Sequence, residues 1–158
     1  MADLSNIVSK VSSVWSEHVK PGDAPGVVIV DASHIREVCE FLQRDPDCYF
    51  DMLSCLTGLD NGPEAGTMEV IYNLYSIPFH LHLMLRVIVR RDNPEVPSVT
   101  SVYRTANWHE REAYDLFGIR FTGHPDLRRI LLPADWEGYP LRKDYRHQEY
   151  YRGVKVEY

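Results

Sequence analysis

Residues 68–89 read MEVIYNLYSIPFHLHLMLRVIV and contain two runs in which apolar and polar side chains alternate. The even-numbered residues from Met68 to Leu74 are apolar, and so are the odd-numbered residues from Leu81 to Val89. Alternation with period two predicts two strands that each bury one face. Because a turn signal, Ser76-Ile77-Pro78, lies between the runs, the stretch predicts an antiparallel pair of central strands.

Other periodic segments lie before this pair. The helical spacing of the apolar residues from Leu4 to Trp15 predicts a helix that Lys20-Pro21-Gly22 stops. Val27–Val30 predicts a short buried strand, and Ser33 is expected to cap a second helix that ends at Asp45-Pro46. Residues 49–59 fit a strand or a short helix equally well.

Two more helices are expected after the pair. One begins at Ser98 and runs to Tyr103. The other is capped by Asn107, with Glu110 three residues later completing a capping box, and Gly118 ends it in a left-handed conformation. Helices on one face of a mixed, mostly antiparallel sheet give an α+β fold, a two-layer α/β sandwich.

Composition and charge exclude several classes of protein. The chain has 158 residues, 44% hydrophobic and 25% charged, which is ordinary for a globular domain and excludes wholesale disorder. Its formal net charge of −6 makes nucleic acid an unfavourable partner. No apolar run approaches the roughly 20 residues that span a bilayer, and the start, MADLSNIV, does not resemble a signal peptide. Three cysteines without a C-x-x-C pair favour a reducing, cytosolic setting.

The periodicity stops after Gly118. Glycines and prolines punctuate residues 118–158, which also hold many aromatic and aliphatic side chains and carry a net charge of +2 against −8 for residues 1–117. We therefore expect an α/β domain over 1–117 and a long irregular, extended partner-binding segment over 118–158. The alternative is that this segment folds back to cover the open face of the sheet.

Residues with chemical potential form no self-contained active site in the sequence. His109, Glu112 and Asp115 share a helix face, which leaves a small metal-dependent hydrolase as a rival hypothesis, but structural salt bridges among Arg111, Glu112 and Asp115 are favoured. His80 and His82 are expected on one strand face. The cysteines at 39, 48 and 55 are too widely spaced for an iron–sulfur motif. No catalytic, cofactor-binding or metal-binding residue is predicted.

The later part of the chain resembles a known family. EREAYDLFGI at 110–119 and GHPDLRRILLP at 123–133 resemble the signature of the respiratory complex I 30-kDa subunit, and WEGYPLRKDY at 136–145 is similar to that family's next block. Over residues 1–106 only the order of elements and the length agree. The residues expected to have a structural role, from the capping and salt-bridge arguments above, are Asn107, Glu110, Arg111, Glu112, Asp115 and Gly118.

The resemblance also implies a function. It implies a cofactor-free assembly subunit, a separate polypeptide, in the peripheral arm of a proton-translocating NADH-quinone oxidoreductase, whose FMN, iron–sulfur clusters and quinone belong to partner subunits. It further implies contact with the 49-kDa-type subunit and a place at the cytoplasmic face of the bacterial inner membrane, held there through the complex. The residues expected to contact partners are His124, Arg128, Arg129, Trp136, Tyr139, Arg142, Lys143, Asp144 and Tyr145.

Two other functions stay open at this point. Related membrane-bound hydrogenases and F420-linked complexes contain similar subunits, so the electron donor is inferred from the resemblance alone. A stand-alone interaction module, whose carboxy-terminal segment docks a different partner, is the alternative from another class.

Overall fold

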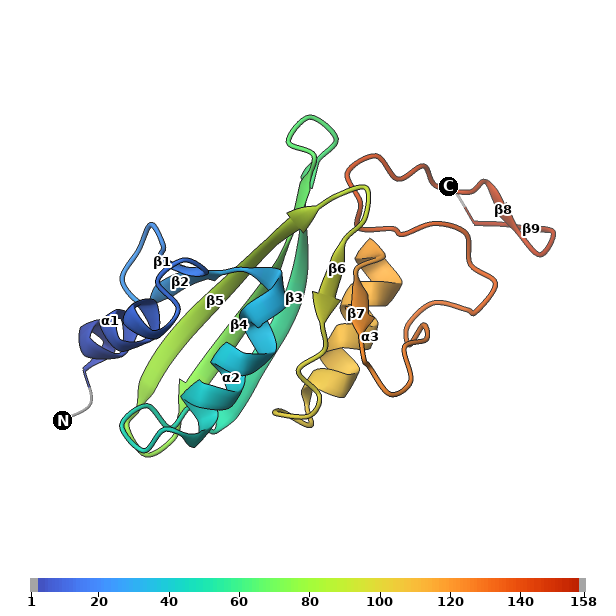
Figure 1. Ribbon diagram of the computed structural model, residues 1–158. Coiled ribbons are helices and arrows are strands. Elements are labelled where there is room, and N and C mark those ends of the chain that lie inside the picture. The colour runs from blue at the N-terminus through green and yellow to red at the C-terminus, as the bar shows by residue number, and fades with distance from the viewer. Residues whose placement is uncertain (1–2, 157–158) are drawn as a thin grey trace.

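The computed structural model describes residues 3–156. Its centre is a five-stranded sheet in the order β1-β2-β5-β4-β3 (Figure 1). β5 pairs with β2 in parallel, and the other neighbours are antiparallel, so the mixed, mostly antiparallel α+β sheet is confirmed. The strands are β1 Val19–Pro21, β2 Val27–Val30, β3 Met52–Gly62, β4 Thr67–Ser76 and β5 Leu81–Arg90.

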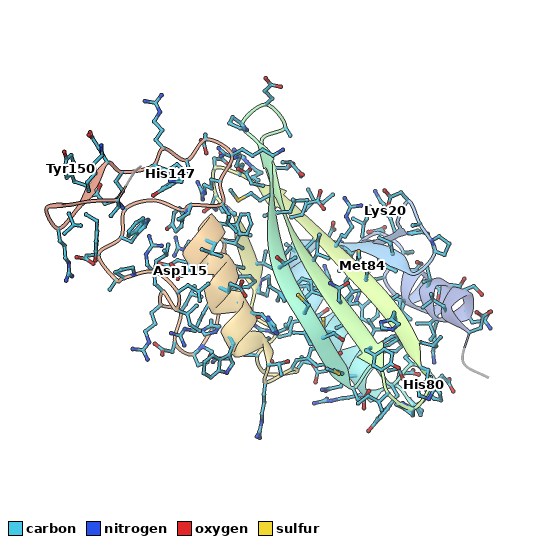
Figure 2. The ribbon with its side chains drawn as sticks, turned by 180° about the vertical axis from the view of Figure 1, so that it is seen from behind. Lys20, His80, Met84, Asp115, His147 and Tyr150 are labelled. Atoms are coloured by element: carbon cyan, nitrogen blue, oxygen red, sulfur yellow. The ribbon has the colours of Figure 1, made fainter. Side chains whose placement is uncertain are left out.

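Three α-helices accompany the sheet: α1 Leu4–Val14, α2 Ile35–Arg44 and α3 Ala106–Phe117. The helix α2 lies across one face of the sheet, α1 lies beside β1, and α3 lies beside β3 at the opposite end (Figure 1). The sheet turns its even-numbered β4 residues and odd-numbered β5 residues into the core, as the alternation predicts. Figure 2 shows the other face, where Met84 is half-buried and no helix of residues 3–156 lies over the strands.

A second, two-stranded sheet lies beside α3. β6 Glu95–Pro97 pairs in parallel with β7 Arg120–Thr122, and α3 is the connection between them. Ile119 and Phe121 are buried in the main core, so the chain is still part of the packed body several residues beyond α3. Near the carboxy terminus, β8 Tyr150–Tyr151 and β9 Val154–Lys155 form a short hairpin.

The structure corrects the expected start of helix α2. Its first turn is preceded by a 3₁₀ turn, η1 Ala32–His34, and no side chain caps either element. The Ser33 hydroxyl bonds to Nδ1 of His34 at 2.9 Å instead of a backbone N–H. Because the 3₁₀ turn already satisfies the first backbone donors, Ser33 is not needed as a cap.

The two helices expected after the central pair are also corrected. Residues 98–103 form turns, not a helix, and α3 begins at Ala106, so Asn107 lies inside its first turn and caps nothing. Glu110 does not close a capping box, because its carboxylate accepts hydrogen bonds from Ser98 Oγ and Val99 N at 2.7 Å each. Gly118 does end α3 in the left-handed region, with φ of 75°.

The carboxy-terminal segment differs from the long irregular extension that the sequence predicts. Residues 123–149 contain no helix or strand, but they do not leave the domain. They fold back along the outer side of α3 and return toward the end of β3, so they do not cover the open sheet face either (Figures 1 and 2). We call residues 123–156 the tail.

The strand register makes a stability prediction. Leu85 is fully buried on β5, whereas Ile88 lies on the other face of the same strand and is 44% exposed. We expect Leu85→Ala to lower the free energy of unfolding by about 2–5 kcal/mol, and Ile88→Ala by less than about 1 kcal/mol. Denaturant midpoints measure both, and equal losses would contradict the register. Arg86 is unsuitable as the control because it makes two hydrogen bonds to the buried carboxylate of Glu69.

Candidate partner interface

The tail is attached to α3 by one buried carboxylate. Asp115 lies on the side of α3 that faces the tail (Figure 2) and has no solvent exposure. Its Oδ1 accepts from Arg129 Nη1 at 2.8 Å. Its Oδ2 accepts from three consecutive tail N–H groups, those of residues 130, 131 and 132, at 3.0, 2.7 and 2.9 Å.

These contacts also decide the charge of Asp115. Burial alone raises the pKa of a carboxyl, but the Arg129 guanidinium and the three N–H groups favour the charged form more strongly and hold the pKa of Asp115 below its usual range. Asp115 is therefore a structural anion. Its partner is Arg129 across 14 residues, not Arg111 as the sequence suggests. Arg111 donates instead to the carbonyl oxygens of Arg128 and Arg129.

Arg129 and Arg142 hold the middle of the tail around one aromatic ring. The guanidinium carbon of Arg129 lies 5.2 Å from the centre of the Tyr139 ring, and that of Arg142 lies 4.9 Å from it. Arg142 Nε donates to the carbonyl oxygen of Phe117 at 2.7 Å. Arg142, which the sequence places at the partner interface, thus bonds within the chain, because the last residue of α3 supplies the acceptor.

Gly118 makes this packing feasible. A Cβ there would lie 2.6 Å from Tyr139 and 2.8 Å from Arg142, and φ at this position is 75°. A side chain at residue 118 would therefore be strained in its backbone and would also displace the tail.

A second buried carboxylate, that of Asp60, holds the tail at Lys143. Asp60 on β3 is 2% exposed and accepts from Arg91 at 2.8 and 3.0 Å, as well as from the backbone N–H of Lys143 at 2.8 Å. Arg91 also pairs with Asp144. The hydrogen bonds from Arg91 outweigh burial and lower the pKa of Asp60 to about 2. Sequence reasoning missed Asp60, although an acid at an inward position of a strand was a signal.

The first residues of the tail lie next to Glu110. His124 has a fully buried side chain whose Nε2 lies 4.0 Å from Glu110 Oε2. Nδ1 of His124 accepts from the N–H of Asp126 at 2.9 Å, so Nε2 carries the proton and donates to the carbonyl oxygen of Asn107 at 3.1 Å. Burial outweighs the hydrogen bonds from Ser98 and Val99 and raises the pKa of Glu110 to about 7.

Aromatic residues of the tail pack on one another. The indole Nε1 of Trp136 donates to the Tyr145 hydroxyl at 3.1 Å, and its ring lies 5.2 Å from that of Tyr151. Asp135 accepts from Tyr151 and Arg152. Trp136 is thus part of the tail's own packing.

Other large apolar side chains remain exposed, and sequence reasoning did not single them out. Trp108 on α3 is 66% exposed, Leu131 63% and Leu141 52%. The signal for Trp108 was its position off the buried face of α3, which is formed by Ala106, Glu110, Ala113 and Phe117. Whether the residues predicted at the interface contact a partner stays a prediction. The structure shows that Arg129, Tyr139 and Arg142 are used inside the chain.

The geometry does not support the rival hypothesis of a metal-dependent hydrolase. Among the described residues 3–156, His109, Glu112 and Asp115 do not gather as metal ligands, and every oxygen of Asp115 is already bonded. His80 lies in the turn before β5 and bonds to Tyr75, so it does not share a strand face with His82. Burial raises the pKa of the Cys39 and Cys48 thiols, the latter to about 11, so neither is a thiolate near neutral pH.

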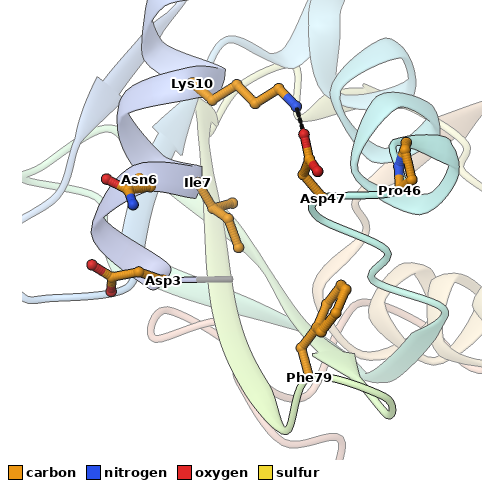
Figure 3. A pocket seen from close by; sticks show the side chains of 7 residues that line it. All are labelled: Asp3, Asn6, Ile7, Lys10, Pro46, Asp47 and Phe79. Carbon is orange, nitrogen blue, oxygen red and sulfur yellow. Dashed lines mark hydrogen bonds and ion pairs between the residues drawn. The ribbon is translucent and has the colours of Figure 1, made fainter. Parts of the chain in front are cut away.

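One pocket lies at the other end of the sheet. Figure 3 shows its lining, which comes from α1, the loop after α2 and the turn between β4 and β5. Lys10 is the cation in it, but its Nζ already pairs with Asp45 and Asp47 at 2.8 and 3.0 Å. With this charge neutralised, we assign no function to the pocket.

Comparison with known proteins identifies the family. The family described as "Respiratory-chain NADH dehydrogenase, 30 Kd subunit" matches residues 28–151. The chain belongs to this family. Its match includes all of α3 and the tail up to Tyr151, and therefore both buried carboxylates and their partners.

Relatives in the family are subunits C of NADH-quinone oxidoreductases. That of Chloroherpeton thalassium is 50% identical over 119 residues, which are 75% of this chain and 49% of the relative. That of Chlorobium phaeobacteroides is 46% identical over 135 residues, 85% and 81% of the two chains. That of Trichlorobacter lovleyi is 43% identical over 149 residues, 92% and 91%. The chain thus spans about half the length of the first relative and nearly all of the third.

Solved structures share the fold. The trypsin-resistant fragment (1-134) of Nqo5 aligns with a TM-score of 0.62 and 28% identity, over 78% of this chain and 98% of the fragment. A chain of the membrane-bound sulfane sulfur reductase (MBS), an archaeal respiratory membrane complex, aligns with a TM-score of 0.73 over 90% of this chain and 85% of its own length. At 23% identity, the second likeness shows the fold alone.

The Asp115 contacts predict how the tail is held. Asp115→Asn keeps the size of the side chain but removes the charge that Arg129 and three N–H groups stabilise, so we expect the tail to detach more often. Limited proteolysis should cleave residues 124–156 at least several-fold faster than in the wild type. Glu112→Gln is the matched control, because Glu112 is exposed on the same helix. Equal cleavage of all three proteins would contradict the role of Asp115.

The raised pKa of Glu110 predicts a pH dependence. The folded state holds a proton up to about pH 7, whereas the carboxyl of an unfolded chain loses it near pH 4.3. This contribution to stability is therefore complete below about pH 4 and is lost as pH rises through 7. Relative to Glu110→Gln, which does not titrate, the wild type should lose on the order of 3 kcal/mol of unfolding free energy across that range. Parallel profiles for the two proteins in denaturant titrations from pH 5 to 8 would refute it.

Proposed function

We propose that this chain is a structural subunit of the peripheral arm of a proton-translocating NADH-quinone oxidoreductase and holds no cofactor itself. In this proposal FMN, the iron–sulfur clusters and quinone belong to partner subunits. The chain sits at the cytoplasmic face of the bacterial inner membrane and is held there through the complex. Family membership and relatives of 43–50% identity support the proposal. None of the helices in residues 3–156 has the length and apolar character to cross a bilayer.

The observation that best supports a docking role is that Leu131 and Leu141 are exposed although their backbone is fixed by hydrogen bonds. The backbone N–H of Leu131 is bonded to the buried Asp115, and that of Leu141 is bonded to the carbonyl oxygen of Leu116 at 3.0 Å. Their side chains nevertheless remain 63% and 52% exposed. The backbone that carries these side chains is therefore ordered before binding, so a partner that covers them does not have to order this part of the chain. Together with Trp108 they form the anchors of the proposed interface.

The residues expected at the interface take two roles in this proposal. Arg129, Tyr139 and Arg142 fix the shape of the tail and present the anchors, as do His124, Trp136 and Tyr145. Arg128, 72% exposed beside Asp126, supplies a polar contact at the rim. Lys143 and Asp144 link the tail to Asp60 and Arg91 and lie at its other edge. The partner proposed is the 49-kDa-type subunit.

The alternative of an equivalent subunit in a hydrogenase or F420-linked complex is weaker. The likeness to a chain of the sulfane sulfur reductase concerns the fold only, so the fold does not identify the electron donor. The three sequence relatives described above, which are 43–50% identical, are subunits C of NADH-quinone oxidoreductases. A co-purified complex that oxidises hydrogen or reduced F420 but not NADH would favour the alternative.

The anchors can be tested without disturbing the fold. We expect a double Leu131→Ser, Leu141→Ser variant to bind its neighbour more weakly by on the order of 2–4 kcal/mol, at least a thirtyfold rise in Kd. In membranes of a strain with this variant as its only copy, the assembled complex and NADH-driven quinone reduction should fall together. The melting temperature of the free subunit should hardly change, because both side chains are exposed.

The control is Val14→Ser, since Val14 is 55% exposed on α1 at the other end of the sheet. Substitution is preferable to truncation after Gly123, which would also remove the partners of Asp115 and Asp60. If the double variant assembles as well as the Val14 variant, the leucines are not anchors and the proposed interface is wrong.

A further inference from the structure

A group of metal-ligating side chains lies far from the tail. His18 precedes β1, Asp31 follows β2, and His34 ends the 3₁₀ turn η1. Each offers one nitrogen or oxygen atom, and these three atoms lie within 4.8 Å of one another. Among residues 3–156 this is the one group of three or more such side chains that close together. β1 is the sheet edge opposite β3, so the group and α3 are at different ends of the molecule (Figure 1).

The backbone fixes the three residues relative to one another. The N–H of Asp31 donates to the carbonyl oxygen of His18 at 2.8 Å, directly beyond the last pair of the β1–β2 ladder. The N–H of His34 donates to the carbonyl oxygen of Asp31 at 3.0 Å. Hydrogen-bonded neighbours therefore supply all three side chains, and a ligand would not have to order a loop to bring them together.

The side chains already interact with one another. The imidazole rings of His18 and His34 stack with centroids 3.9 Å apart and an interplanar angle of 17°. Asp31 Oδ2 lies 2.8 Å from His18 Nδ1, and the Ser33 hydroxyl lies 2.9 Å from His34 Nδ1. Ser33 leaves Nε2 of His34 available and holds the ring by its other nitrogen, as groups behind metal-bound histidines commonly do.

We propose that His18, Asp31 and His34 bind a divalent transition metal ion, with Zn²⁺ as the fitting member of this class. Two imidazoles and one carboxylate are a common zinc ligand set, and they leave the fourth tetrahedral position to water or to an outside group. Zinc bonds of about 2.0–2.1 Å place neighbouring ligand atoms about 3.3 Å apart. The lone pairs of two stacked rings lie in parallel planes and do not point at one ion. One imidazole must therefore rotate about its side-chain torsions when the metal binds. Both side chains are partly exposed and have room to do so.

The proposal is independent of the docking role. Asp31 and His34 fall inside the family match at 28–151, whereas His18 precedes it, so the match does not account for the complete group. The competing explanation is an ordinary surface ion pair, His18 with Asp31, beside a second stacked histidine. That pair would bind no metal at stoichiometric concentration.

The test uses the full chain without a histidine tag. Isothermal titration with Zn²⁺ should give one site per chain, and each of His18→Ala, His34→Ala and Asp31→Asn should weaken it at least tenfold. His147→Ala, in an exposed part of the tail, is the control and should leave the affinity unchanged. Titration with Co²⁺ should give the intense visible absorption of a four-coordinate ion and should lose it in the same three variants.

Competition with excess Mg²⁺ separates this site from general attraction to an acidic protein. Mg²⁺ prefers oxygen ligands and should not displace Zn²⁺. Circular dichroism of each variant shows whether the fold is intact. If Zn²⁺ binding is absent, is displaced by Mg²⁺, or survives all three substitutions in folded protein, the proposal is wrong. Because assembly of the complex is not part of the readout, that failure would leave the docking proposal untouched.

Discussion

The Asp115 carboxylate controls where the tail lies. It is buried on α3 and accepts four hydrogen bonds from the tail, one from a guanidinium and three from consecutive backbone N–H groups. A buried carboxylate without partners costs several kcal/mol, whereas one with four donors remains charged. An irregular segment therefore acquires one position without forming a helix or a strand.

Asp60 holds the tail at a second point, where it accepts a hydrogen bond from the backbone N–H of Lys143. The two carboxylates lie on different elements, α3 and β3, so the tail is fixed at two separated points and cannot turn about either. Arg129, Tyr139 and Arg142 fill the space between them and use the backbone carbonyl groups at the end of α3. The order of the tail thus depends on polar contacts that hydrophobic burial alone would not specify.

The regular elements follow from the sequence because their signals are local. The alternation over 68–89 predicts β4 and β5 and the side of each that is buried, and the residue spacing in α1 and α2 predicts those helices. The helix expected from Ser98 fails because Ser98 and Val99 donate to Glu110, a contact between residues 11 and 12 positions apart that holds this segment in turns. The ion pairs Asp115–Arg129 and Asp60–Arg91 cannot be predicted from the sequence either, since any charge can pair with many others until the fold brings two together.

The same reasoning explains why the predicted anchors and the exposed ones differ. Arginine, tryptophan and tyrosine stabilise a protein interface and an irregular segment by the same contacts, so composition alone does not distinguish the two uses. Here Arg129, Arg142 and Trp136 already donate hydrogen bonds within the chain, so fewer of their donors are left for a partner. The side chains of Leu131, Leu141 and Trp108 still face water, so a partner that covers them gains the free energy of burying apolar surface. The part of this surface that Leu131 and Leu141 form is therefore a product of the tail's folding, and it depends on the burial of Asp115.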